Sequence, residues 1–154
     1  YGSETKVQSK ESECEELVAL IVADGPDEKE NPGLVHQLIE FLPKLEFEAR
    51  KDVTSIYCYL LRRTTMSGTF PSVEYNLKHT DIIERLVLGH DIPETALCCG
   101  QMIRDTVNHE IMAKFILWNE SLFYHFFRFI NLSNFEVASD AFATFKELIT
   151  KHKV

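Results

Sequence analysis

The sequence predicts an all-α fold, an armadillo/HEAT-like right-handed helical repeat in which each unit has two short helices followed by a long one. Two observations lead to this prediction. Apolar residues recur every three or four positions along much of the chain, which is the spacing of one side of an α-helix. The pattern of the last helix also occurs twice earlier, with starts at residues 47, 93 and 135 that are separated by 46 and 42 residues. A period of roughly 40–47 residues is typical of HEAT and armadillo repeats.

The last twenty residues, Phe135 to Val154, predict the clearest helix. Either Ser133 or Asn134 is expected to cap its start, because a short polar side chain can accept hydrogen bonds from the first free backbone amides. Glu136 near the start and Lys151 near the end suit the helix dipole. The apolar residues expected along its inner side are Val137, Ala138, Ala141, Phe142, Phe145, Leu148 and Ile149.

Two earlier segments, beginning at Phe47 and at Pro93, overlay this helix. In the first, Phe47, Asp52 and Tyr57 stand where Phe135, Asp140 and Phe145 stand later. In the second, Cys99 and Ile103 overlay Ala141 and Phe145. We therefore expect three long helices that occupy equivalent places in successive repeats.

The remaining elements follow from turn residues and apolar spacing. Residues 1–11 are expected to be a flexible N-terminus or an expression-tag remnant, and residues 12–154 a single helical-repeat domain. Pro71 is well placed to open a short helix, and Gly89 to end the next one. Pro93 is expected to open the second long helix. The predicted helices are 12/13–23, 34–42, 47–63, 71–79, 80/81–88, 93 to about 108, 109/110–118, 121–130 and 135–154.

The composition excludes several classes of function. The chain has 154 residues and a formal net charge of −8, which argues against nucleic-acid binding because that needs clustered Lys and Arg. No apolar run approaches the ~18 residues that span a bilayer. The four cysteines show no CxxC spacing, and three lie on predicted apolar helix faces. Buried free thiols in a reducing compartment are the expected state, which favours a cytoplasmic protein.

Five segments of the chain resemble one known family, the calcium-binding protein 39 (mouse-protein-25-like, Hym-related) scaffold family. The resemblance is dense from residue 47 to 154, and its most specific stretch is SDAFATFK. The segments are FEARKDV…LLRR (47–63), PSVEY (71–75), PETALCCGQMIRD (93–105), HEIMAKFILW (109–118) and SDAFATFKELITKHK (139–153).

The resemblance implies a horseshoe of helical repeats that acts as an adaptor for protein kinases. Family members bind the pseudokinase STRAD, stabilise its closed state and help to activate an LKB-type kinase. They also dock on germinal-centre kinases of the sterile-twenty class. The family continues well beyond the position of Val154, so the chain is expected to be an N-terminal and central fragment. A solenoid cut there exposes an apolar face, and we expect self-association through that end.

The resemblance also implies where a partner binds. Phe135 matches a family position on the concave surface that contacts kinase and pseudokinase domains, and a buried aromatic anchor is a typical hot spot. The alternative is that Phe135 packs on the previous helix as a hydrophobic staple. Four further candidates lie on the polar side of the same helix, where a solvated face is the default: Ser139, Asp140, Lys146 and Glu147.

No motif in the sequence predicts catalysis, a metal or a cofactor. His109-Glu110 is not half of HExxH, because position 113 is Ala. Asp24-Gly25 lacks the ligand series of a calcium loop despite the family name. Cys58 and Cys98 fall mid-helix among apolar neighbours, where a thiol stays protonated and inert. Arg62, Arg63, Arg104 and Asp105 are expected near helix ends in water, with kinase contact as the alternative.

The resulting hypothesis is a non-enzymatic adaptor that binds a protein kinase or pseudokinase through its concave face. It would act by binding the closed kinase state better than the open one, and a tenfold shift needs only ~1.4 kcal/mol of differential affinity. The alternative is a general peptide-binding helical solenoid with no kinase link, which a groove rich in Asn would favour.

Overall fold

The computed structural model describes residues 2–27 and 32–152. Within these ranges the chain forms helices joined by loops and contains no strand. Parts of two predicted segments, residues 28–31 of the charged loop and Lys153 after the last helix, lie outside the described residues. The elements are α1 Gly2–Ile21, α2 Leu34–Phe41, η1 Leu42–Lys44, α3 Phe47–Arg62, α4 Pro71–Lys78, α5 Asp81–Leu88, η2 Gly89–Asp91, α6 Ala96–Thr106, α7 Glu110–Trp118, α8 Glu120–Phe129 and α9 Phe135–Thr150.

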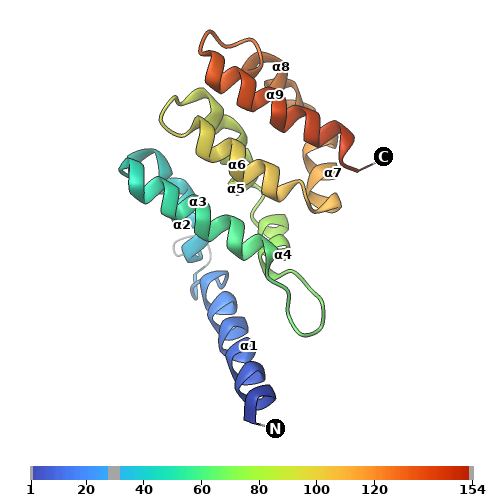
Figure 1. Cartoon of the computed structure of the whole chain (residues 1–154). Coiled ribbons are helices and arrows are strands. Elements are labelled where there is room, and N and C mark those ends of the chain that lie inside the picture. The colour runs from blue at the N-terminus through green and yellow to red at the C-terminus, as the bar shows by residue number, and fades with distance from the viewer. Residues whose placement is uncertain (1, 28–31, 153–154) are drawn as a thin grey trace.

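The longer helices α3, α6 and α9 lie side by side, with α6 in the middle (Figure 1). Two short helices precede α6 and two precede α9, so the predicted order of short, short and long is confirmed for α4–α6 and α7–α9. The all-α, armadillo/HEAT-like prediction is confirmed, because equivalent long helices stack as neighbours in successive units. None of the helices in the described part of the chain combines the length and apolar character needed to cross a membrane.

The core lies between the long helices and the short helices behind them. Two buried aromatic side chains from α8, Phe126 and Phe129, pack on the ring of His90 in η2. The predicted role of the 122–130 aromatic run as core packing is thus confirmed for these residues, whereas Tyr124 and Phe127 are exposed. The fully enclosed apolar residues of α5, α6 and α7 are Ile82, Ile83, Leu86, Val87, Met102, Ile103, Met112, Ala113 and Ile116.

A carboxylate joins the loop after α1 to α4. Asp24 accepts hydrogen bonds from the backbone amide of Gly33 at 3.2 Å and from the hydroxyl of Tyr75 at 3.0 Å. Its other oxygen lies 2.9 Å from Lys78 Nζ and 3.0 Å from His79 Nε2. Burial raises the pKa of Asp24, but these hydrogen bonds together lower it well below its usual range. The ionised form of Asp24 therefore stabilises this junction.

The N-terminus differs from the prediction. A loose segment over residues 1–11 and a helix start at Ser12 or Glu13 were expected, but α1 is helical from Gly2. The side chains of residues 4–13 are all exposed. They include Glu, Lys and Gln, which lose little side-chain freedom in a helix, so this half of α1 is helical without packing on anything. The C-terminal half of α1 carries its contacts with the rest of the molecule, with Val18 buried.

The start of α6 also differs, because it begins at Ala96 and not at Pro93. Pro93 lies in a turn, and the buried Thr95 fixes the entry into the helix. The hydroxyl of Thr95 donates to the carbonyl of Gly89 at 2.9 Å. The turn is thereby tied to η2, and the expectation that Pro93 is the first helical residue is wrong.

The inner side of α9 is partly different from the one expected. Val137, Ala141 and Leu148 are buried as predicted, but Phe142 and Ile149 are 57% and 47% exposed. Thr144 is fully buried although it is polar. Asn134, one of the two expected caps, accepts a hydrogen bond from the amide of Val137 at 3.2 Å. The buried stripe is therefore narrower than the apolar pattern suggested.

Candidate functional site

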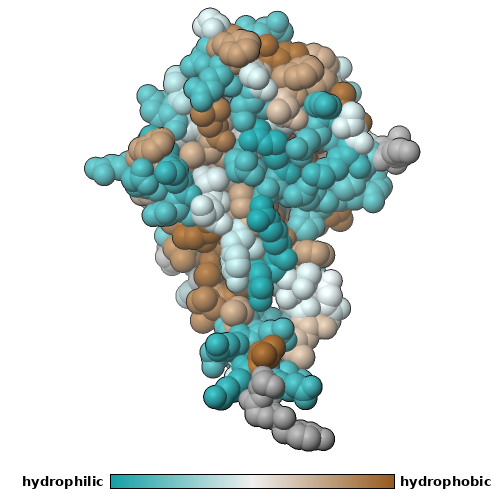
Figure 2. Space-filling view, viewed as in Figure 1, coloured by the Kyte–Doolittle hydropathy of each residue, from teal (hydrophilic) through white to brown (hydrophobic). Residues whose placement is uncertain are grey.

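A shallow, open groove of about 640 Å³ runs between α6 and α9. It lies on the face formed by the three long helices, which is largely hydrophilic over α6 and α9 (Figure 2). Three of the five predicted partner-binding residues line it, namely Phe135, Ser139 and Asp140. The complete lining is Leu97, Gln101, Arg104, Phe135, Glu136, Ser139, Asp140 and Ala143.

An ion pair crosses the floor of this α6–α9 groove. Arg104 Nη1 lies 2.8 Å from Asp140 Oδ1, and the two side chains are only 17% and 19% exposed. The same nitrogen donates to the hydroxyl of the buried Thr144 at 2.9 Å. Asp140 and Arg104 were both expected on solvated helix surfaces, and that expectation is wrong. The pair instead ties α9 to α6, because a partly buried charge needs a partner.

Gly100 allows the two helices to approach at this point. A Cβ atom at position 100 would overlap Asp140 Oδ2, so only glycine leaves room for the carboxylate. Asp140 Oδ2 is buried and has no hydrogen-bond partner among the described residues. The Arg104–Asp140 ion pair and the absence of a side chain at Gly100 are thus parts of the same contact between α6 and α9.

Phe135 is the first residue of α9, lies at that end of the groove, and is 84% exposed. The hydrophobic-staple alternative is wrong, because a staple would bury the ring against the preceding segment. Leu97 of α6, 39% exposed, lines the same groove. An exposed aromatic ring and a half-exposed leucine beside an ion pair form a surface with an apolar end and a polar floor.

The other predicted residues lie elsewhere along α9. Ser139 is exposed at the groove, whereas Lys146 and Glu147 are not part of its lining. Lys146 is exposed, and Glu147 pairs with Lys151 at 3.2 Å within the helix. The structure therefore brings three of the five candidates together and leaves two on the last turns of the helix.

On the α6 side of the groove, sequence reasoning missed Leu97 and Gln101 and gave partner contact by Arg104 only as an alternative. Leu97, Gln101 and Arg104 follow one another at spacings of four and three, which places them on one helix face. The 42-residue offset contained the signal, because it overlays Leu97 on Ser139 and Gln101 on Ala143. Equivalent faces of neighbouring repeats meet at the same groove.

The adjacent residues Arg104 and Asp105 bind opposite neighbours. Asp105, a buried carboxylate, lies 2.5 Å from Arg62 Nη2 at the end of α3. Arg104 points the other way, to α9. The expectation that Arg62 and Asp105 lie in water is wrong for Asp105, which is 8% exposed in its side chain. Charged residues on α6 thus connect all three long helices.

The cysteines and histidines do not form a reactive centre in the described residues. Burial raises the pKa of Cys58 and of Cys99 to about 12, so both thiols stay protonated, as predicted for Cys58. Burial also lowers the pKa of His90, whose Nδ1–H donates to the carbonyl of Val87 at 2.9 Å. Over residues 2–27 and 32–152, no three His, Cys, Asp or Glu side chains are grouped so that they could hold a metal ion.

Comparison with known proteins adds the family. The Mo25-like family profile matches residues 3–154. The chain is 49% identical over 121 residues to "Degreening-related gene dee76 protein" of Auxenochlorella protothecoides, covering 79% of this chain and 37% of that protein. It is 44% identical over 133 residues to "Calcium-binding protein 39-like" of Homo sapiens, covering 86% and 39%. It is 39% identical over 153 residues to "MO25-like protein 2" of Caenorhabditis elegans, covering 99% and 42%.

The chain spans about two fifths of the length of these relatives. The match begins at residue 3, so it includes the N-terminal third in which the sequence resemblance is faint. The predicted family is thereby confirmed. Since the profile covers nearly all of the sequence and these relatives are 39–49% identical over the aligned residues, the chain belongs to the Mo25-like family.

Proposed function

We propose that the chain is a non-catalytic adaptor that binds a protein kinase or pseudokinase, of the sterile-twenty class or STRAD type, across the α6–α9 groove. The observation that carries this proposal is the 84% exposed ring of Phe135 beside Leu97 on the face of the long helices. A large aromatic side chain left in water at the edge of a groove is suited to be an interface anchor. Family membership supports the choice of a kinase fold as the partner.

The polar floor of the groove supports binding to a folded surface. The Arg104–Asp140 pair is held by contacts within the chain, so the groove keeps its shape before a partner arrives. A preformed surface loses less conformational entropy on binding than a flexible one. None of the groove-lining residues is Asn, so the alternative of a general peptide-binding solenoid with an Asn ladder gains no support from it.

The test is a calorimetric titration of this chain with a purified sterile-twenty-class kinase domain and, separately, with a pseudokinase domain. Phe135→Ala is expected to weaken binding by ~2 kcal/mol, roughly 30-fold, because the ring would be buried in the complex. Its removal should leave the unfolding free energy nearly unchanged, since the ring packs on little in the free chain.

Phe142→Ala provides the matched control. Phe142 is also an exposed phenylalanine of α9, at 57%, but it does not line the groove. Its variant should bind like the unchanged chain. Equal weakening by both substitutions would contradict the assignment to the groove, and no binding to either domain would remove the kinase proposal for this chain.

A further inference from the structure

The end of α3 and the loop that joins it to α4 carry a short sequence that the proposed function does not use. Arg62-Arg63-Thr64-Thr65 places arginines three and two residues before a threonine. Protein kinases with acidic substrate grooves select acceptors by such arginines, because guanidinium groups pair bidentately with carboxylates. The loop protrudes from the body of the molecule (Figure 1), and Met66 at its tip is 78% exposed.

The hydroxyl of Thr65 is the centre of a local network in this loop. Its Oγ1 lies 2.7 Å from the hydroxyls of both Ser67 and Thr69, and it accepts from the amide of Thr69 at 3.1 Å. The backbone amide of Thr65 donates to the carbonyl of Thr69 at 2.9 Å. Gly68 closes the turn with a positive φ of 82°. These bonds of Thr65 stay within the loop, so the segment can open into a kinase once two contacts outside it, Arg62 with Asp105 and Met66 with Glu15, are released.

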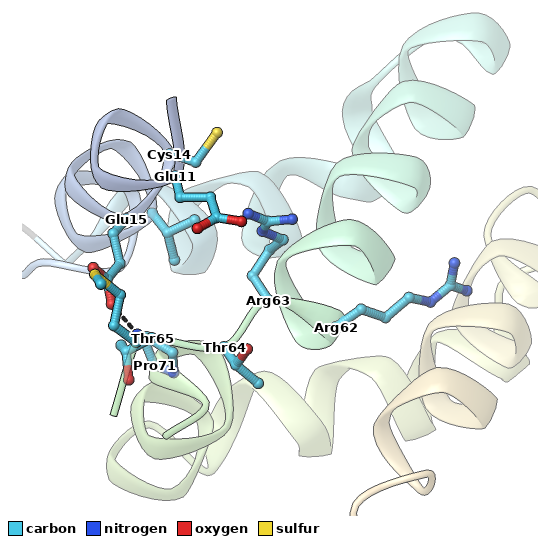
Figure 3. A pocket seen from close by; sticks show the side chains of 10 residues that line it. Glu11, Cys14, Glu15, Arg62, Arg63, Thr64, Thr65 and Pro71 are labelled. Carbon is cyan, nitrogen blue, oxygen red and sulfur yellow. Dashed lines mark hydrogen bonds between the residues drawn. The ribbon is translucent and has the colours of Figure 1, made fainter. Parts of the chain in front are cut away.

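The acidic side of α1 lies beside this loop. A cavity of about 310 Å³ is lined by Glu11 and Glu15 from α1 and by Arg63 and Thr65. The amide of Met66 donates to Glu15 Oε1 at 2.6 Å, which fastens α1 to the loop. Figure 3 shows the Glu11 carboxylate and the Arg63 guanidinium pointing toward one another, while Arg62 points away toward α6.

We propose that Thr65 is a phosphorylation site for an arginine-directed protein kinase, and that its phosphate loosens α1. The γ-phosphoryl group of ATP is transferred to Thr65 Oγ1. The phosphorus–oxygen bond to ADP breaks, the bond to threonine forms, and the hydroxyl proton passes to the base of that kinase. The product carries a charge of about −1.5 to −2 at this position.

The consequence for α1 follows from charge. The phosphate shares its cavity with Glu11 and Glu15, which it repels, and with Arg63, which it attracts away from Glu11. α1 is held by few contacts: Val18 is its only buried residue among those described, Ile21 is partly buried, and Glu15 binds the amide of Met66. Loosening α1 removes one wall of the apolar groove of about 490 Å³ that it forms with α3, lined in part by Leu17, Ile21, Ile56 and Tyr59.

The first test is to incubate the chain with ATP and the catalytic subunit of a cyclic-AMP-dependent protein kinase, and to map phosphate by mass spectrometry. Thr65→Ser should retain the phosphate at position 65, whereas Thr65→Val should lose it. Arg63→Gln is expected to lower the rate about tenfold, because one of the two charged recognition groups is gone. Ser67→Ala leaves the motif intact and should be labelled like the unchanged chain. Labelling confined to Thr64, Ser67 or Thr69, or none at all, overturns the proposal.

The second test follows α1 in the phosphorylated chain through the alkylation rate of Cys14, which lines both cavities and is partly buried. Phosphorylation should raise this rate about tenfold through like-charge repulsion. Cys98 on α6 has a similar intermediate exposure and is the internal control, whose rate should not change. An unchanged Cys14 rate in a chain fully phosphorylated at Thr65 would overturn the coupling to α1.

Discussion

The helices at the two ends of the described chain, α1 and α9, are both regular but are held in different ways. α9 buries Val137, Ala141, Thr144 and Leu148 over its sixteen residues and is tied to α6 by the Arg104–Asp140 pair. α1 is longer, at twenty residues, yet buries only Val18 among its described side chains. Its first half is surrounded by solvent.

The contrast between α1 and α9 shows that helix formation and helix packing depend on different features of the sequence. The polar N-terminal half of α1 consists largely of residues that suit a helix in isolation, so it needs no neighbour to set its local conformation. α9 has a stripe of small and apolar residues at spacings of three and four, which fixes one face against α6 and α8. Helix-favouring residues are enough to predict a helix, but only an apolar stripe predicts that the helix packs on its neighbours.

The largest expected contrast comes from the same substitution made in both helices. Leu148→Ala in α9 should lower the free energy of unfolding by ~2–5 kcal/mol, because the side chain is fully buried and leaves a cavity. Leu17→Ala in α1 should change it by less than ~0.5 kcal/mol, because Leu17 is 57% exposed. Chemical denaturation of both variants measures the two values. Equal losses would mean that α1 is packed as firmly as α9.

Acid should affect the two regions in separate pH ranges. His90 packs under α8, and its pKa is lowered by burial, so the neutral form is favoured when folded. Its contribution is complete above the unfolded pKa of about 6.5 and is lost as the pH falls below that value. Asp24, beside the end of α1, has a lowered pKa and favours the charged form. Its contribution is complete above about 3.9 and is lost only below that pH.

The measurement is the unfolding free energy between pH 7 and 3 for the unchanged chain and two variants. His90→Gln keeps a side-chain donor but does not titrate, and should flatten the decline between pH 6.5 and 5 by up to ~2 kcal/mol. Asp24→Asn should leave that decline unchanged and flatten the part between pH 4 and 3 by ~1 kcal/mol. The opposite assignment of the two ranges would refute the roles given to these groups.

A smaller effect tests whether the polar contact helps to hold α9. A double-mutant cycle of Arg104→Ala and Asp140→Ala should give a coupling of ~1–2 kcal/mol, since both side chains are mostly shielded from water. The exposed pair of Glu48 and Lys51 in α3 is the control, with an expected coupling below ~0.5 kcal/mol. Indistinguishable couplings would leave the apolar stripe as the sole anchor of α9.

Much of the fold was predictable because the same apolar spacing recurs in each repeat of the sequence. The boundaries of α3, α4, α5 and α7 agree with the apolar spacing to within about one residue. The start of α6 was not predictable from Pro93, because the hydroxyl of Thr95 bonds to Gly89 across a turn. The first half of α1 was missed because a polar helix has no periodic stripe to detect.

The candidate site was predictable on one helix only. Phe135, Ser139 and Asp140 were identified on α9, but their surroundings depend on a neighbour 42 residues earlier. Asp140 lies on the polar side of α9 in a helical projection, and nothing local indicates that Arg104 covers it. Thr144 is buried for the same reason, because its hydroxyl accepts from Arg104. The burial of polar residues between repeats therefore depends on their tertiary partners and not on the local sequence pattern.

The close contact at Gly100 has a consequence for how this sequence can change over evolutionary time. A methyl group at position 100 would overlap the Asp140 carboxylate, so any larger residue there requires that the acid be shortened or lost first. Loss of the acid in turn removes the partner of Arg104. We therefore expect positions 100, 104 and 140 to co-vary among homologues as a single unit, although they lie on two helices. An alignment in which these three positions vary independently would show that the contact is not maintained by selection.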